Sequence, residues 1–153
     1  MTQINIRSSI RLAVVVAIGI ASTAFAADLS KFPASSKTGV TYAKDIQPIF
    51  KQYCFKCHGD GPQYRANLRL DSLEAVLKGG KDGKVIVPGK SEESDLVLDV
   101  ARVSEKPMPP KPRAPRGNAG GATNATPPPA PAEVKLTAEE VGLIRAWIDQ
   151  GAN

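Results

Sequence analysis

The fold of this chain is decided by the stretch Cys54-Phe55-Lys56-Cys57-His58. It has the form C-x-x-C-H, the spacing with which haem is attached covalently to a protein. On a helical turn, positions i, i+3 and i+4 share one face. Cys54 and Cys57 can therefore reach the two vinyl groups on one haem edge, while His58 is carried beneath the ring. The motif predicts one covalently bound haem c with His58 as an axial iron ligand.

The first 26 residues predict a secretory signal peptide. Arg7 and Arg11 form a short basic region, residues 12–21 are an apolar run, and residues 24–26 (Ala-Phe-Ala) are a small-x-small cleavage site. The apolar run is too short to span a bilayer comfortably. We therefore expect cleavage after residue 26 and a periplasmic, exported protein. An uncleaved segment that tethers the protein to the membrane is the less favoured alternative.

A pair of cysteines has other uses. In an exported chain, a disulfide between Cys54 and Cys57 is the first alternative. A thioredoxin-like redox pair needs a preceding strand and a surrounding sheet, which this sequence does not offer. A zinc site needs more thiolate or imidazole ligands, but the chain has two cysteines and one histidine in all. Haem is favoured because the histidine, the export signal and the helical context occur together.

The composition sets limits on the partners and on the core. The full chain carries a net charge of +5, and loss of Arg7 and Arg11 with the signal peptide would leave +3. This charge does not call for a nucleic-acid or membrane partner, and it is compatible with a mildly acidic protein partner. Residues 27–41 are expected to be a lead-in segment. Because a Pro/Gly-rich tract takes up much of the rest, the core is small, and small cores often depend on a cofactor.

The apolar pattern predicts an all-α domain over residues 42–153. From Asp45 onward, apolar residues at i, i+3, i+4 and i+7 form one helix face. Pro48 is tolerated only in the first turn of a helix, which fits a start capped by Asp45. Phe50 lies on the apolar face and is expected to pack where the first and last helices cross.

Two short helices are predicted in the middle of the domain. Asp71, with Glu74 three residues later, resembles a capping box that opens a helix ended at Gly79. Ser91 is expected to cap a third helix, because acidic residues follow it in the first turn. The buried face of this third helix is expected to include Val103.

The last helix is the best defined by the sequence. Thr137 is its predicted cap, Glu140 completes a capping box, and Gly151 is the stop. The preceding residues 111–135 are rich in Pro, Gly and Ala and lack apolar periodicity. They are predicted to form a flexible, low-complexity loop before the C-terminal helix.

Met108 is predicted to be the second axial ligand of the iron. His58 is the only histidine, so two histidine ligands within one chain are excluded, and Met108 is the only methionine after the initiator. His/Met ligation is the usual pairing in electron-transferring c-type haem proteins and raises the reduction potential. The neighbours Pro107, Pro109 and Pro110 stiffen the backbone that presents this weak thioether ligand. The alternatives are a gap-filling methionine, an open sixth position, or a lysine ligand.

Several short motifs occur in a fixed order along the chain. They are Ile46-Gln47-Pro48-Ile49-Phe50, Cys54 to Gly59, Leu68-Arg69-Leu70-Asp71-Ser72, Gly79-Gly80, Val87-Pro88-Gly89-Lys90, Glu93-Ser94, Met108-Pro109-Pro110, and Leu136-Thr137 with Trp147-Ile148-Asp149-Gln150-Gly151-Ala152. With these motifs the chain resembles the small class I cytochrome c domains of the planctomycete type, over most of residues 42–153. The resemblance implies the all-helical class I cytochrome c fold, packed around one haem c. It also implies that Cys54 and Cys57 form the thioethers and that His58 and Met108 are the axial ligands. One departure is that residues 111–135 are longer and richer in Pro and Ala than this loop usually is.

The predicted function is one-electron transport between a donor and an acceptor redox protein. The sequence shows no catalytic dyad or nucleophile, and a six-coordinate iron leaves no position for a substrate. We therefore expect no enzyme activity, no small-molecule substrate and no nucleic-acid partner. One alternative is a haem enzyme subunit or gas sensor, in which Met108 is absent from the iron or easily displaced. Another is an interaction module with a Cys54–Cys57 disulfide and no haem.

Overall fold

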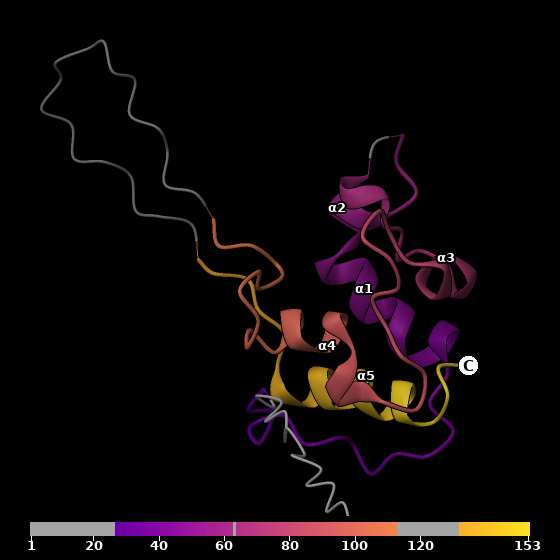
Figure 1. The fold of residues 1–153 in the computed structure, drawn as a ribbon, viewed down its shortest axis with the longest axis vertical. Helices are drawn as coiled ribbons and strands as arrows, with labels where there is room; N and C mark the ends of the chain where they lie inside the picture. Colours follow the sequence, from indigo (N-terminus) through magenta and orange to yellow (C-terminus); the bar gives the residue numbers. More distant parts are fainter. Residues whose placement is uncertain (1–26, 63, 113–131) are drawn as a thin grey trace, which may run out of the picture.

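The structure is a computed structural model that describes residues 27–62, 64–112 and 132–153 (Figure 1). Within these ranges it contains helices and an isolated bridge between Gly80 and Gly83, but no β-strand. The predicted all-α class is confirmed for this part of the chain. The predicted signal peptide at 1–26, and residues 113–131 of the predicted loop, lie outside the described residues. In chain order the elements are η1 (Tyr42–Ile46), α1 (Gln47–Tyr53), α2 (Phe55–His58), η2 (Arg65–Asn67), α3 (Leu73–Lys78), η3 (Ser91–Glu93), α4 (Asp95–Val100) and α5 (Ala138–Asp149).

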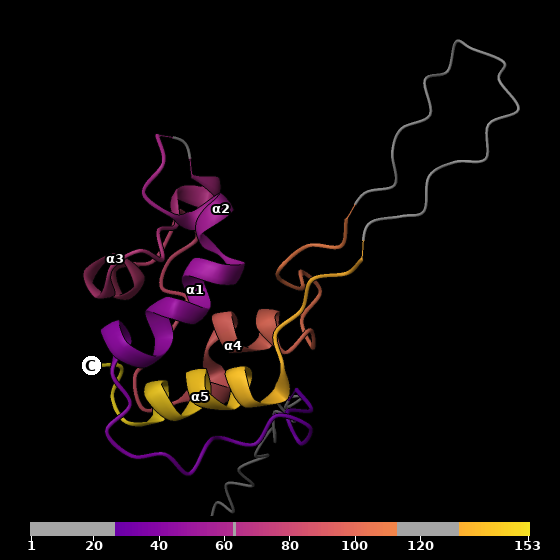
Figure 2. The same ribbon diagram turned by 180° about the vertical axis from the view of Figure 1, so that it is seen from behind.

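The helices form two groups along the long axis of the molecule. Figures 1 and 2 show α4 beside α5 at one end, and α2 at the other end, with α1 between them. The element α3 stands on the side of α1 opposite to the segment that follows α4. Among the described residues, no helix has the length and apolar character needed to cross a membrane.

The first helical stretch starts earlier than predicted. It begins at Tyr42 with the π-helical turn η1, and α1 follows at Gln47 with Pro48 in its first turn. The predicted cap, Asp45, therefore lies inside the helical stretch. Its carboxylate accepts a hydrogen bond from the backbone N–H of Thr41 at 2.9 Å. This bond satisfies an N–H that a helix start would otherwise leave unpaired, and it therefore stabilises the additional turn.

The predicted cap of α3 was wrong by one residue. Ser72, and not Asp71, accepts a hydrogen bond from the backbone N–H of Ala75 at 3.3 Å. The carboxylate of Asp71 is instead paired with the guanidinium of Arg69. The helix ends at Gly79, where φ is +82°, a conformation that glycine adopts without steric cost.

The predicted start of the third helix was also wrong. Ser91 opens the 3-10 turn η3, and α4 begins at Asp95. The Ser91 hydroxyl is engaged by α5 instead of capping a helix: it accepts from Arg145 Nε at 3.2 Å and donates to Asp149 at 2.9 Å, and the Ser91 backbone N–H donates to the same carboxylate at 2.8 Å. Val103 is 36 % exposed and lies outside α4, because Arg102 at φ +62° follows the end of the helix.

The C-terminal helix and its capping box are confirmed. Thr137 accepts a hydrogen bond from Glu140 N–H at 3.2 Å, and the Glu140 carboxylate accepts one from Thr137 N–H at 2.8 Å. Phe50 and Trp147 are both fully buried, with ring centroids 6.5 Å apart in an edge-to-face arrangement. Tyr42 lies 6.2 Å from Phe50 and 5.9 Å from Trp147. The predicted contact between the first and last helices is therefore made by three aromatic rings.

The lead-in segment at residues 27–41 packs against α5. Ser35 N–H donates to the carbonyl of Gly142 at 2.9 Å. A side chain at position 142 would place its Cβ 2.5 Å from the carbonyl oxygen of Pro33, so glycine is needed for this close approach. The buried guanidinium of Arg145 donates to Phe32 O at 2.6 Å and to Glu92 at 2.8 Å. These contacts join the lead-in, η3 and α5.

Candidate functional site

The C-x-x-C-H residues lie on the helical turn that their spacing predicts. Cys54 stands between α1 and α2, and its carbonyl accepts from Cys57 N–H at 3.0 Å and from His58 N–H at 2.8 Å. Both cysteines are free thiols and both are partly buried. Gly59 follows at once, and a Cβ there would come within 2.6 Å of the carbonyl oxygen of Phe55. Only glycine, which has no Cβ, therefore fits at position 59.

The Cys54 thiol is held in its protonated form. Burial, and secondarily the neighbouring Cys57, raises the pKa of this thiol to about 12. Redox-active cysteine pairs instead have thiols with depressed pKa values, because the thiolate is the nucleophile. The environment of Cys54 thus differs from that of a thiol–disulfide exchange site.

The imidazole of His58 is oriented by a backbone carbonyl. Its Nδ1 lies 3.1 Å from the carbonyl oxygen of Leu68. A carbonyl accepts and cannot donate, so the proton of the neutral ring is on Nδ1, and Nε2 keeps its lone pair. A hydrogen bond of this kind fixes the tautomer and orientation of a metal-binding histidine. The carbonyl of His58 in turn accepts from Leu70 N–H at 2.7 Å, which ties the two segments together.

The loop that presents the Leu68 carbonyl has an unusual backbone. Ala66 and Asn67 both have positive φ, at +54° and +53°. For a non-glycine residue this conformation costs about 1 kcal/mol or more, so neighbouring contacts must hold it. Lys81 N–H donates to the Ala66 carbonyl at 2.8 Å. At Gly80, a Cβ would lie 2.7 Å from the same oxygen. The turn after α3 thus supports the loop from outside.

Two further residues position this loop and were not found from the sequence. The Tyr42 hydroxyl donates to the carbonyl of Leu70 at 2.8 Å, and the Gln47 amide donates to the carbonyl of Asp71 at 2.9 Å. Both bonds join the loop to η1 and α1. Their acceptors are backbone carbonyls, which every residue has. No sequence pattern could therefore have indicated these partners.

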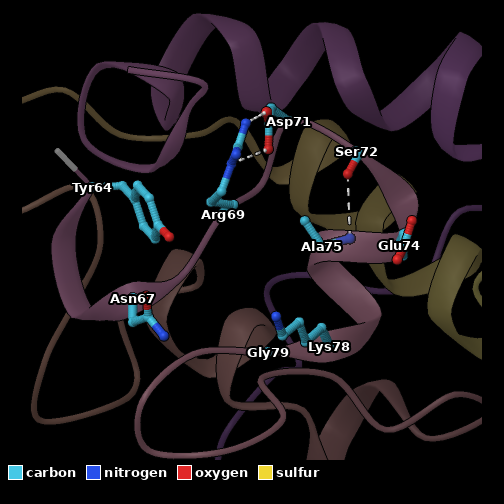
Figure 3. Close-up of a pocket in the computed structure, with 9 residues that line it drawn as sticks. All are labelled: Tyr64, Asn67, Arg69, Asp71, Ser72, Glu74, Ala75, Lys78 and Gly79. Carbon is cyan, nitrogen blue, oxygen red and sulfur yellow. Dashed lines mark hydrogen bonds and ion pairs between the residues drawn. The ribbon is translucent and has the colours of Figure 1, made fainter. Parts of the chain in front are cut away.

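An open pocket of about 460 Å³ lies beside α3 and contains none of the four predicted ligand residues (Figure 3). In Figure 3 the guanidinium of Arg69 pairs with Asp71 and faces the ring of Tyr64, whose centroid is 5.6 Å from Arg69 Cζ. Arg69 also lowers the pKa of the Asp71 carboxyl, because it donates to the carboxylate. Asn67, Arg69 and Asp71, which line the pocket, belong to the same loop as Leu68, whose carbonyl orients His58. The full lining is Tyr64, Asn67, Arg69, Asp71, Ser72, Glu74, Ala75, Lys78 and Gly79.

Met108 lies on the segment after α4, apart from the C-x-x-C-H turn. Its backbone N–H donates to the carbonyl of Asp99, in the last turn of α4, at 2.9 Å. The Met108 side chain is 37 % exposed. No hydrogen bond among the described residues joins this segment to His58. In Figure 1 the C-x-x-C-H turn, at α2, and the segment that follows α4 lie apart from each other.

The Asp99 side chain organises the start of the Met108 segment. Its carboxylate accepts a hydrogen bond from the Ser104 hydroxyl at 2.6 Å, and Ser104 in turn accepts from Lys106 N–H at 3.2 Å. Burial raises the pKa of the Asp99 carboxyl, although the bond from Ser104 acts in the opposite direction. The carboxylate therefore anchors a small turn that leads to Met108.

The donor set fits a c-type haem. Two free thiols three residues apart can form two thioether bonds, and the His58 Nε2 is available to bind iron. Met108 offers a thioether sulfur from a second segment. The match to the haem group thus rests on the tautomer of His58 as well as on the cysteine spacing.

Comparison with known proteins agrees with this chemistry. No curated protein and no solved structure matches the chain. One family model does match, and its range begins at Cys54 and includes His58 and Met108. Residues 54–112 match the family described as Planctomycete cytochrome C, which supports a planctomycete-type cytochrome c domain in this part of the chain.

Proposed function

We propose that the protein is an exported monohaem cytochrome c that carries one electron at a time between redox partner proteins. The family match supports a haem-binding electron-transfer protein. The number of haem groups, their covalent attachment, the export and the partners are parts of the proposal. When bound, the haem iron supplies one-electron chemistry by changing between its ferric and ferrous states.

The observation that carries the proposal is the hydrogen bond from His58 Nδ1 to the Leu68 carbonyl, at 3.1 Å. It directs Nε2 away from the loop and leaves it as the ligand atom. Cys54 and Cys57 would hold the haem through one thioether bond each. The helical turn then keeps the imidazole and the two sulfurs in one fixed relation, so the ligand geometry is preorganised before electron transfer.

Met108 is the proposed second ligand. Met108 and Val103 are apolar, yet they are 37 % and 36 % exposed. A haem ring held against this segment would cover such side chains and remove apolar surface from water. With two protein ligands the iron has no open position, so the protein would act as a carrier and not as an enzyme. Redox proteins outside the cytoplasmic membrane are the proposed electron donor and acceptor.

The test is to produce the full chain in a host that matures c-type cytochromes and to purify the exported protein. We expect an intact mass equal to residues 27–153 plus one haem, and haem that stays with the polypeptide after acid–acetone extraction. These results would support export, cleavage, haem number and covalent attachment together. A colourless protein, with Cys54 and Cys57 oxidised to a disulfide, would contradict the proposal.

The absorption spectrum tests the second ligand separately. We expect sharp c-type bands in the reduced protein and a sulfur-to-iron charge-transfer band in the oxidised protein. Haem bands without the sulfur band, together with strong binding of carbon monoxide by the reduced protein, would instead favour a haem enzyme or gas sensor with an open distal position.

A further inference from the structure

Arg102 occupies an unusual place at the end of α4. It directly follows Ala101, the C-cap of this helix, and has a left-handed φ of +62°. Its backbone N–H donates to the Asp99 carbonyl at 3.1 Å. Although it lies on a loop, its side chain is only 18 % exposed. Charged side chains are rarely buried to this extent unless they are paired with other groups.

The guanidinium of Arg102 has two partners from different segments. One Nη donates to the carbonyl of Pro109 at 3.0 Å, and the other donates to the carboxylate of Glu133 at 2.6 Å. Pro109 directly follows Met108, and Glu133 lies just before α5. One planar side chain therefore joins the end of α4, the Met108 segment and the segment that leads into α5.

These contacts hold Met108 from both sides. The backbone N–H of Met108 donates to the carbonyl of Asp99 in α4. The carbonyl of the following residue, Pro109, accepts from Arg102. The loop from 102 to 109 is thereby closed on α4 at both ends. The Glu133 side chain is 40 % exposed, so this ion pair orients the guanidinium and adds little energy of its own.

We infer that Arg102 is a positioning residue for Met108: its bond to the Pro109 carbonyl holds the Met108 sulfur in place for the iron. The inference rests on the proposed role of Met108 as a ligand. An arginine is suited to this task because its rigid fork reaches two acceptors at once, whereas a lysine ammonium is a single flexible donor. Loss of the fork frees the loop, so the sulfur is displaced more readily from the iron.

The test compares Arg102→Ala, Arg102→Lys and Glu133→Gln in the purified haem protein. The readouts are the sulfur-to-iron band, the reduction potential, and the affinity of the ferric protein for imidazole, which competes with Met108. For Arg102→Ala we expect retained haem, a weaker sulfur band, a lower potential, and an imidazole affinity raised on the order of tenfold, the effect of losing one charge-assisted hydrogen bond. Arg102→Lys should be intermediate, and Glu133→Gln should change the affinity less than about twofold.

The chain offers a matched control in Arg145. This arginine also donates to a carbonyl, that of Phe32 at 2.6 Å, and to a glutamate, Glu92 at 2.8 Å. Its contacts join the lead-in to α5 and do not involve the Met108 segment. Arg145→Lys should lower the unfolding temperature but leave the sulfur band, the potential and the imidazole affinity unchanged.

Two outcomes would overturn the inference, and they are distinguishable. If Arg102→Ala lowers only the unfolding temperature, as Arg145→Lys does, Arg102 is a structural contact without a role at the ligand. If the unmodified protein holds haem but lacks the sulfur band, the proposed ligation by Met108 is itself wrong, and Arg102 has no ligand to position.

Discussion

The two segments that carry the proposed iron ligands are held in different ways. The stretch from Cys54 to His58 is a helical turn, closed by bonds between close neighbours such as Cys54 and His58, at 2.8 Å. The segment from Ala101 to Lys111 has no regular structure beyond a turn. It is fastened to α4 through Asp99 and to the residues before α5 through Arg102 and Glu133. One ligand is therefore placed by local structure and the other by tertiary contacts.

This difference suggests different behaviour of the two ligands. Local helical bonds re-form whenever the turn folds, so His58 should keep its position on the turn beside Cys54 and Cys57 under mild destabilisation. The Met108 segment relies on a few bonds at its ends, and regions held in this way open at lower free energy than the core. We therefore expect the Met108 segment to open before the His58 turn does, on heating, with a competing ligand or after a mutation.

The largest effect is expected from removal of the two thiols. The double variant Cys54→Ala/Cys57→Ala should retain no haem after extraction, because no thioether bond can form. It should also lose much of its helical circular dichroism, since a bound group stabilises the native state that binds it. Lys56→Ala is the matched control, as Lys56 lies in the same turn and is exposed. Haem that survives extraction in the double variant would rule out attachment through these cysteines.

A smaller effect is expected at Met108. Met108→Ala should keep the haem attached, bind carbon monoxide when reduced, and have a reduction potential lower by the order of 0.1 V, within the span of about 0.8 V that axial ligands cover. Met108→Leu separates ligation from packing, because leucine has a similar volume but no sulfur. Both variants should therefore show the same drop. A leucine variant with the wild-type potential would mean that Met108 contributes only apolar volume.

The smallest effect is expected at the support of the histidine side. Tyr42→Phe keeps the aromatic contacts with Phe50 and Trp147 but leaves the Leu70 carbonyl without its donor, at a cost of about 1–3 kcal/mol in the free energy of unfolding. Urea unfolding measures this cost, and Tyr64→Phe, at an exposed ring, should change stability by less than about 0.5 kcal/mol. The sulfur-to-iron band should be unaffected by Tyr42→Phe. Loss of that band would show that the two sides are coupled.

The same tyrosine predicts a dependence on alkaline pH. Burial raises the pKa of Tyr42 to about 12 from the ordinary value of 10.0. The native state thus holds this proton more tightly than the unfolded state does. The stabilisation is complete below pH 10.0 and is lost as the pH rises towards about 12. Stability measured across this range should fall less steeply in Tyr42→Phe than in the wild-type protein.

Features that depend on a few neighbouring residues could be predicted from the sequence. The C-x-x-C-H turn and the capping box of Thr137 and Glu140 follow from spacing alone. Both are formed by hydrogen bonds within one turn of helix, and the residue types that make them are restricted. The burial of Phe50 against α5 also followed from the apolar pattern. These features needed no knowledge of distant partners.

Features that depend on distant partners could not be predicted from the sequence, and the two wrongly predicted helix caps show why. Asp71 and Ser91 are good capping residues, but Arg69 engages the first and Asp149 engages the second. A side chain with two potential partners takes the one that the fold brings close, and the sequence does not record that distance. The orientation of His58 by the Leu68 carbonyl, and of Met108 by Arg102, depends on backbone acceptors that have no residue signature. The proposed ligands could therefore be predicted from the sequence, whereas the groups that orient them are set by the packing of the chain.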